Sequence, residues 1–295
     1  MTEKIHYLLH GIQDRYSALY QDNIAELGTR DIVIASIGGS GQSLLGNILL
    51  ELGLNYSDPY IDALSADGTS RPVPAYADYR SRLAATDRYG GADTAEGTAR
   101  WPRFVKTHLT PDFLVHRPLL GAWILVRDPR DALYSWHKFR TDFAKDPLDL
   151  KARTFAEWLE QPGPTGVSRL DDWASFYDAW AAARESFPRT TVTTFEDLKS
   201  DPVPALEKSL SDLGIDIDVT DLAPAVERSS FDSMRAHEEK HPDNDARDPM
   251  TKTRIMRSGT PNEWQSWMTP GLHRKFSTGH IAAAARRFGY RTERT

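Results

Sequence analysis

Two segments far apart in the chain carry residues suited to binding phosphate. In the first, an apolar and β-branched run at 32–37 is followed by a glycine-rich turn made of Gly38, Gly39, Ser40, Gly41, Gln42 and Ser43. A helical pattern begins directly after this turn. Backbone N–H groups are unpaired at a helix N-terminus, and the helix dipole adds positive potential there. Residues 31–53 therefore predict an anion site made from backbone groups.

The second segment, at 121–139, brings a fixed cation to an equivalent position. A strand expected at 122–126 delivers Arg127 to its carboxyl end, and Ser135 lies on the helix that follows. In open α/β sheets, ligands bind at the carboxyl ends of the strands. Two such strand ends with anion-binding chemistry predict a ligand that carries two separate phosphate groups.

The composition limits the class of protein and its partners. The chain has 295 residues, enough for one large α/β domain, and its net charge of −6 argues against nonspecific nucleic-acid binding. It has no cysteine, which excludes disulfides, thiolate metal sites and a cysteine nucleophile and fits a reducing compartment. Its apolar runs are all shorter than a membrane span. We therefore expect a cytoplasmic protein without a nucleic-acid or membrane partner.

Alternating strand and helix patterns must position these two segments. Apolar periodicity predicts strands at 103–107, 122–126 and 190–198, and helices at 4–27, 202–213, 221–229 and 271–287. Between them we expect an inserted loop region with short helices at 56–100 and a lid loop at 237–256. The alternation predicts a single α/β domain over residues 1–295, with a central, mostly parallel sheet flanked by helices.

Four motifs in this chain resemble those of the sulfotransferases that use 3′-phosphoadenosine 5′-phosphosulfate (PAPS). They are FVKTHLTPDFL at 104–114, VRDPRDALYSWHKF at 126–139, SSFDSM at 229–234 and RSGTPNEWQSWMT at 257–269, in the order of the family. The resemblance implies a fold like that of P-loop nucleotide kinases. It also implies transfer of a sulfuryl group from PAPS to a hydroxyl of a small molecule. The product would be 3′-phosphoadenosine 5′-phosphate (PAP), with no metal required. A homodimer is an expected option for its assembly.

The resemblance also assigns roles by position. The residues implied to hold the nucleotide are the turn at 38–43, then Arg127, Ser135, Arg257, Ser258 and Gly259 at the 3′-phosphate, and Ser229 and Phe231 at the adenine. His108 would be the general base that takes the proton from the acceptor hydroxyl, and Lys106 would stabilise the transferring group. These roles suit the chemistry, because in-line transfer depends on positioning and fixed positive charge, and a histidine can take a proton near neutral pH.

The glycine-rich turn departs from the family pattern P-K-S-G-T-T-W. Gly39 stands in place of the lysine, Leu44 in place of the tryptophan, and Phe195 in place of the tyrosine of the Y-E-D segment. Stabilisation of the leaving group must then come from elsewhere, with Lys106 and Arg130 as candidates. Two other hypotheses stay open. One is a nucleotide-dependent transferase with a changed donor or chemistry, and the other is a catalytically silent nucleotide-binding protein.

Overall fold

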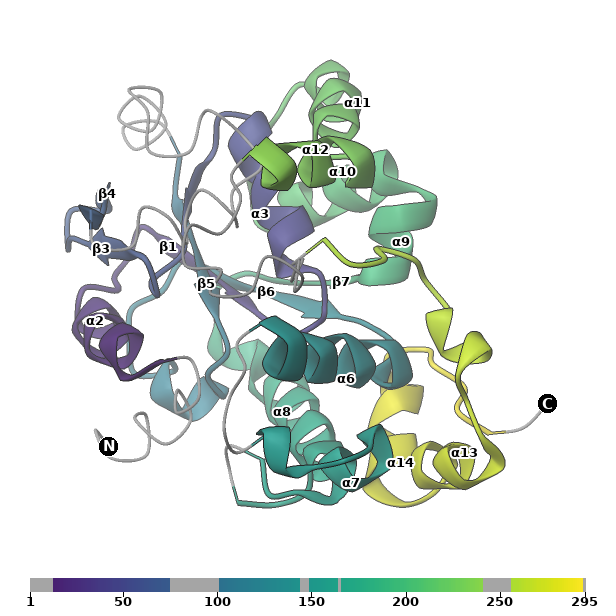
Figure 1. Ribbon diagram of the computed structural model, residues 1–295. Helices are drawn as coiled ribbons and strands as arrows, with labels where there is room; N and C mark the ends of the chain where they lie inside the picture. Colours follow the sequence, from purple (N-terminus) through teal and green to yellow (C-terminus); the bar gives the residue numbers. More distant parts are fainter. Residues whose placement is uncertain (1–12, 75–100, 144–148, 164–165, 241–255, 294–295) are drawn as a thin grey trace.

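A five-stranded parallel sheet forms the centre of the computed structural model, which describes residues 13–74, 101–143, 149–163, 166–240 and 256–293 (Figure 1). In spatial order its strands are β2 (Asn55–Ser57), β5 (Arg103–Thr107), β1 (Asp31–Ala35), β6 (Gly121–Val126) and β7 (Thr190–Thr194). All four neighbouring pairs are parallel. The register places Ala35 beside Thr107 on one side and beside Ile124 on the other. The segments that leave the five strands therefore gather at one edge of the sheet.

Both faces of the sheet are buried, which explains why its two central strands β1 and β6 are nearly continuous apolar runs. One face packs against α3 (Gln42–Glu51), α9 (Phe195–Ser200), α10 (Pro202–Asp212) and α11 (Val219–Arg228). The other face packs against α6 (Pro129–Lys138), α8 (Arg169–Ala183) and α14 (Gly279–Arg287). In β1, Ile32 and Ile34 face the first group of helices, and Val33 and Ala35 face the second. The result is a three-layer α/β domain, as predicted.

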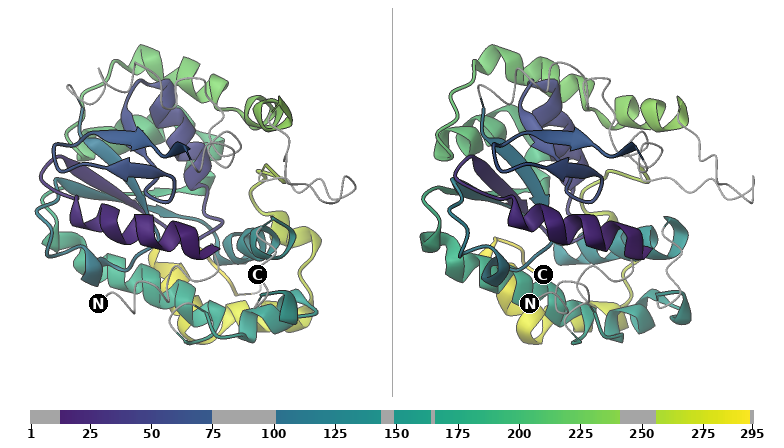
Figure 2. Two further views of the ribbon diagram at one scale, coloured as in Figure 1. Left: turned by 60° about the vertical axis from the view of Figure 1, so that its left-hand side comes forward. Right: turned by 90° about the vertical axis from the view of Figure 1, so that its left-hand side faces the viewer.

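The remaining elements lie around these three layers. Helix α2 (Gln13–Ala25) lies beside an antiparallel pair, β3 (Asp62–Leu64) and β4 (Ser70–Pro72), as Figure 2 shows. The other helices are η2 (Pro111–Phe113), η3 (Phe139–Phe143, a π-helix), η4 (Asp149–Lys151), α7 (Phe155–Glu160), η5 (Arg184–Ser186), α12 (Phe231–Lys240), η6 (Glu263–Ser266) and α13 (Pro270–Ser277). Helix η6 leads into α13, which lies next to α14.

Several sequence-based boundaries were wrong. The helix expected at 271–287 is broken in two, because Thr278 is extended and Gly279 adopts φ +67° between α13 and α14. The strand expected at 190–198 ends at Thr194, whose hydroxyl accepts the N–H of Asp197 and caps α9. Side-chain capping of this kind fixes where a helix begins.

Two expected loops also differ from the structure. The region 56–100 contains β3 and β4 where short helices were expected, and its part at 75–100 lies outside the described residues. Of the expected lid loop at 237–256, residues 237–240 belong to α12, and 241–255 lie outside the described residues. Among the residues described, no helix is long and apolar enough to cross a membrane.

Candidate functional site

The glycine-rich turn joins the buried strand β1 to helix α3. Gly39 and Gly41 adopt φ +82° and +97°, which side chains with a Cβ rarely tolerate. Gln42 and Ser43 begin α3, and the N-cap residue Gly41 has no side chain to accept their N–H groups. The first turn of α3 therefore keeps backbone donors that can bind an anion.

Helix α6 packs directly on this turn and explains two of its glycines. A Cβ atom at Gly38 would lie 2.6 Å from the indole of Trp136, and one at Gly39 would lie 2.3 Å from the carbonyl oxygen of Ala132. Contacts this short do not occur between real atoms without movement of the neighbour, and the neighbour of Gly39 is backbone. The family lysine therefore cannot be accommodated at Gly39 while α6 keeps its place.

Two polar side chains of the turn point into the protein, so any contact of Ser40 and Gln42 with phosphate would be made through their backbone. The hydroxyl of Ser40 is buried 3.1 Å from the hydroxyl of Tyr177. The amide of Gln42 donates to the carbonyl groups of Ile34 at 2.7 Å and Thr107 at 3.2 Å. Gln42 therefore holds the turn against β1 and β5, and Ser40 holds it against α8.

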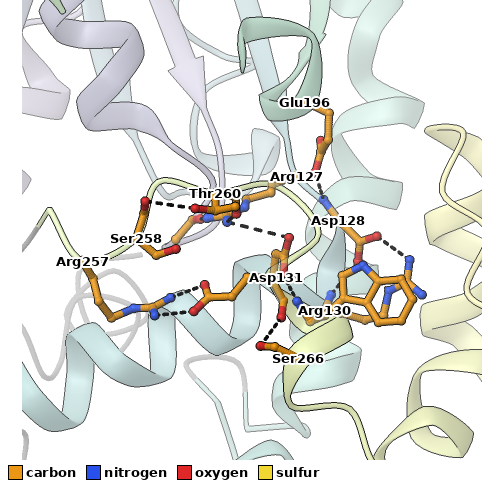
Figure 3. Close-up of polar contacts among 12 residues, drawn as sticks. Arg127, Asp128, Arg130, Asp131, Glu196, Arg257, Ser258, Thr260 and Ser266 are labelled. Carbon is orange, nitrogen blue, oxygen red and sulfur yellow. Dashed lines mark hydrogen bonds and ion pairs between the residues drawn. The ribbon is translucent and has the colours of Figure 1, made fainter. Parts of the chain in front are cut away.

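Arg127 joins the turn to the segment that follows α12 in the chain. Its Nη1 donates to the carbonyl oxygen of Gly39 at 3.0 Å. Its Nη2 donates to the carbonyl oxygen of Thr260 at 3.1 Å, and Figure 3 shows these two residues side by side. The guanidinium lies 4.2 Å from the ring centre of Phe195, which itself fills the space beside Gly41. The Nε of Arg127 is buried and has no hydrogen-bond partner among the described residues. Arg127 belongs to the segment at 121–139 and contacts the turn in the segment at 31–53. It thus connects the two segments that the sequence predicts to bind phosphate.

A carboxylate lies one helical turn beyond Arg127. The Oδ2 of Asp131 is 3.8 Å from Nη2 of Arg127, and its Oδ1 accepts the N–H of Trp264 at 2.8 Å (Figure 3). Burial raises the pKa of Asp131 to about 6, although the charge of Arg127 acts in the opposite direction. The site therefore contains a carboxylate that titrates close to neutral pH.

Arg257 lies over α6, next to the position of Ser135. Its guanidinium forms a two-bond ion pair with Glu263, with both N–O distances 2.5 Å, and stands 5.3 Å from the ring centre of Tyr134. Ser135 directly follows Tyr134 and is half-buried. Arg257 therefore lies over Tyr134 of α6, and it is close enough to Arg127 for its charge to lower the pKa of that guanidinium. The sequence had given no role to Glu263.

The expected adenine residues lie against the Arg257 segment. A Cβ atom at Gly259 would lie 2.6 Å from the ring of Phe231, and Gly259 itself adopts φ +63°. The carbonyl of Ser258 accepts the hydroxyl of Thr260 at 3.2 Å (Figure 3). Ser229 is buried, and within the described ranges its hydroxyl has no hydrogen-bond partner. An unsatisfied buried hydroxyl beside an aromatic ring suits recognition of a heterocycle.

His108 follows β5 and lies against the start of the turn. Its Nδ1 is 2.6 Å from the carbonyl oxygen of Ser36, and because a carbonyl only accepts, this contact assigns the proton to Nδ1. Nε2 then carries the lone pair. Burial, and then the charge of Lys106, lowers the pKa of His108 to about 4. The imidazole is therefore neutral at neutral pH, as a general base must be.

Lys106 is paired with a residue that the sequence did not single out. Its Nζ lies 2.9 Å from Oδ2 of Asp58, and both side chains are largely buried. Asp58 follows β2, which pairs with β5 at the edge of the sheet. This pairing depends on the strand order, so no local motif could have indicated it.

The other cation expected to assist the leaving group is held elsewhere. Arg130 bonds both carboxylate oxygens of Asp128, at 2.8 and 2.5 Å, and stacks 3.6 Å from the ring centre of Trp264. It also donates to the carbonyl of Arg291 at 3.3 Å. Arg130 therefore holds the carboxyl-terminal segment against α6. Of the two cations expected to stabilise the leaving group, Lys106 is the better placed.

The comparisons with known proteins agree with this arrangement. Residues 29–282 match the profile of the sulfotransferase domain. Sulfotransferase 2A6 of Rattus norvegicus is 28% identical over 180 residues, an alignment that covers 57% of this chain and 59% of that protein. The chain thus spans about three-fifths of the length of the first curated relatives it matches.

Two solved structures share the fold. Mouse sulfotransferase SULT7A1, described as complexed with PAP, has a TM-score of 0.59 at 19% identity over 91% of this chain and 89% of that chain. Retinol dehydratase, described in a complex with retinol and PAP, has a TM-score of 0.57 at 18% identity over 96% and 88%.

Proposed function

Because the chain belongs to the sulfotransferase domain family, we propose that it transfers a sulfuryl group from PAPS to a hydroxyl of a small molecule and leaves PAP. The observation that carries this proposal is the double contact of Arg127, which connects the glycine-rich turn with the segment at 257–260. The turn and the segment at 257–260 are both expected to bind an anion, and Arg127 contacts both. A nucleotide with phosphate groups at its 3′ and 5′ positions needs two such anion-binding elements close together.

The residues present fit such a nucleotide. The uncapped first turn of α3 would hold the 5′ end through backbone N–H groups. Arg127, Ser135 and Arg257 would hold the 3′-phosphate, and the Nε of Arg127 has no hydrogen-bond partner in the part of the chain that the structure describes. The orphaned hydroxyl of Ser229 and the ring of Phe231 would hold the adenine. When bound, PAPS supplies the sulfuryl group that is transferred.

Two side chains would act on the reaction itself. His108 has its Nε2 lone pair available and would accept the proton of the acceptor hydroxyl as the new S–O bond forms. Lys106 stands two residues earlier on β5 and would stabilise the negative charge on the transferring group. The descriptions of the two solved relatives, both PAP complexes, support this assignment of the donor.

Turnover with PAPS tests the reaction. The protein is incubated with PAPS and a panel of phenols, aliphatic alcohols and hydroxysteroids, and PAP formation is followed beside sulfated product by mass spectrometry. We expect PAP and sulfated product in equal amounts. His108→Ala should lower the rate about 10²–10⁴-fold while PAP still binds. PAP binding without any transfer in the wild type would favour a silent nucleotide-binding protein.

A changed donor remains the second candidate, and the packing of α6 on Gly39 favours it. A loop that cannot hold the family lysine lacks one charge-assisted contact to the leaving phosphate, which is typically worth about 1.5–3 kcal/mol. If another sulfated or phosphorylated nucleotide supports faster transfer than PAPS under the same conditions, the donor assignment must change.

A further inference from the structure

Asp58 lies at the same edge of the sheet as the proposed catalytic residues. It follows β2, and the register pairs Ser57 with Val105, so Asp58 comes next to Lys106. The Oδ2–Nζ distance is 2.9 Å, with 6% of the Asp58 side chain and 15% of the Lys106 side chain exposed. An ion pair this buried is retained only where geometry and further hydrogen bonds support it.

The turn after β2 is built to hold this carboxylate in one orientation. The Oδ1 of Asp58 accepts the N–H of Tyr60 at 3.1 Å, and the N–H of Asp58 donates to Oδ2 of Asp62 at 2.9 Å. Asn23 of α2 clamps the same turn by donating to the carbonyl groups of Pro59 at 2.8 Å and Asp62 at 2.6 Å. The Tyr60 N–H therefore orients the carboxylate of Asp58, and the other three bonds hold the backbone of the turn that carries it.

The fixed carboxylate in turn fixes the ammonium of Lys106. This ammonium stands 5.2 Å from the ring centre of Tyr60, and the same ring lies 5.8 Å from that of His108. A lysine side chain loses up to about 2 kcal/mol of rotamer entropy when it is held in one place. Asp58 and Tyr60 provide the contacts that offset this loss and keep the ammonium near the imidazole.

We propose that Asp58 is a positioning residue for sulfuryl transfer, which anchors the Lys106 ammonium beside His108. This inference rests on the proposed function. At Gly39 a side chain has no room, and Lys106 is the one lysine at the carboxyl ends of the five strands within the described residues. The correct placement of this ammonium therefore matters more here than in a site that has a second lysine in the turn.

A double-mutant cycle with kcat as the readout tests the proposal. We expect Asp58→Ala to lower kcat about 10- to 100-fold, because misplacement of a catalytic group by about 1 Å can cost 10²-fold. Lys106→Met should lower kcat about 10²–10³-fold. If Asp58 acts through Lys106, the double variant Asp58→Ala/Lys106→Met should be no slower than Lys106→Met alone. If the fold loss of kcat in the double variant equals the product of the losses in the two single variants, the residues act independently and the proposal is wrong.

Two further variants separate positioning from a general loss of structure. Asp58→Asn keeps one acceptor oxygen for the Lys106 ammonium but loses the charge and the acceptor of the Tyr60 N–H, so its kcat should fall between those of wild type and Asp58→Ala. Asp62→Asn keeps an acceptor for the Asp58 N–H and leaves the carboxylate that holds Lys106 unchanged, so it should stay near wild type. If Asp62→Asn is as slow as Asp58→Ala, the turn and not the anchored ammonium is responsible, and the proposal is wrong.

The anchoring can also be measured without catalysis. Reductive methylation followed by peptide mass spectrometry reports how accessible each lysine amine is. Lys208, whose side chain is 71% exposed, gives the reference rate. We expect Lys106 to react at least about tenfold more slowly in wild type and to lose this protection in Asp58→Ala. Equal protection in both proteins would contradict the anchor. A protein that shows the anchor but no turnover with PAPS would refute the proposed function instead.

Discussion

At the scale of single residues, the hydrogen bond between His108 and Ser36 decides which nitrogen can act. The carbonyl of Ser36 holds the proton on Nδ1, so Nε2 is the basic atom. Burial and the nearby ammonium of Lys106 both disfavour the imidazolium and lower the pKa of His108 to about 4. The imidazole of His108 is thus kept neutral at pH values where an ordinary histidine would be protonated.

This lowered pKa predicts an unusual pH profile. A base is active when neutral, so kcat should fall only as pH decreases through the pKa of His108. Between pH 7.5 and 5.5 we expect kcat at saturating PAPS to fall less than about twofold, whereas a histidine with pKa near 6.5 would leave about a tenth of the base neutral at pH 5.5. A tenfold fall over this range, with the fold intact by circular dichroism, would contradict the environment described for His108.

Asp131 gives a second residue-scale prediction. Its pKa is already raised to about 6, and a phosphate dianion that binds Arg127 should raise the pKa further by repulsion. PAP binding at pH 7 should therefore include proton uptake at Asp131, and the other charged groups near it are Arg257, Glu263 and Asp128. Calorimetry in two buffers of different ionisation enthalpy measures this uptake. Asp131→Asn should bind fewer protons than wild type, and the same number in both proteins would exclude Asp131 as the site of uptake.

At the scale of elements, the contact between α6 and the glycine-rich turn explains the main departure from the family pattern. The missing lysine is not an isolated substitution, because the backbone of Ala132 occupies the place that its Cβ would need. Trp136, one turn further along α6, fills the corresponding space at Gly38. The turn and the helix have therefore adapted to each other.

This packing predicts that Gly39 cannot be replaced by any residue with a Cβ. Gly39→Ala and Gly39→Lys should both lower the free energy of unfolding by about 2–5 kcal/mol, since the left-handed backbone costs about 1–2 kcal/mol and overpacking about 1–3 kcal/mol. Denaturant titration measures the loss, and Gly28→Ala is a suitable control because its Cβ would meet nothing within 4 Å. If Gly39→Lys is as stable as wild type and speeds transfer from PAPS, the packing of α6 does not prevent a lysine at this position.

The sequence was most informative about elements with a strong local signal. Strands β1 and β6 were predicted because burial on both faces makes them mostly apolar, and β5 was predicted from its shorter apolar centre at Phe104 and Val105. The break between α13 and α14 was missed because apolar residues occur on both sides of it, at Phe276 and Ile281, and no proline marks it. Strands β2 to β4 were missed because three residues show no periodicity.

Within the site, the residue types could be predicted from the sequence, but the directions in which some side chains point could not. Ser40 and Gln42 belong to the phosphate-binding turn in sequence, yet their side chains satisfy Tyr177 and the ends of β1 and β5. Asp58 was missed because it becomes a neighbour of Lys106 only through the order of the strands. Local patterns do not carry this information.

At the scale of the whole molecule, the candidate site lies between the two layers of helices that cover the sheet. One side is formed by α3, α9 and the start of α12, and the other by α6 with the segment that leads through η6 to α13 (Figure 1). Arg127 spans the boundary, because its two carbonyl partners belong to the turn before α3 and to the segment before η6. A nucleotide bound here would join both parts and stabilise the fold.

Stabilisation by PAP follows from this arrangement. A ligand at 100 times its Kd that binds only the folded state adds about 2.7 kcal/mol to the free energy of unfolding. We therefore expect PAP to raise the midpoint of thermal unfolding by several degrees, in a concentration-dependent way. An unchanged midpoint at millimolar PAP would argue against a nucleotide site in this boundary.

The most direct test of the central claim compares PAP with adenosine 5′-phosphate by calorimetry. The two differ only in the 3′-phosphate, which should meet Arg127, Ser135 and Arg257. Charge-assisted hydrogen bonds contribute about 1.5–3 kcal/mol each, so we predict that PAP binds at least about 100-fold more tightly. Arg257→Gln should remove at least tenfold of this preference. Equal affinities of the wild-type protein for the two nucleotides would contradict the account.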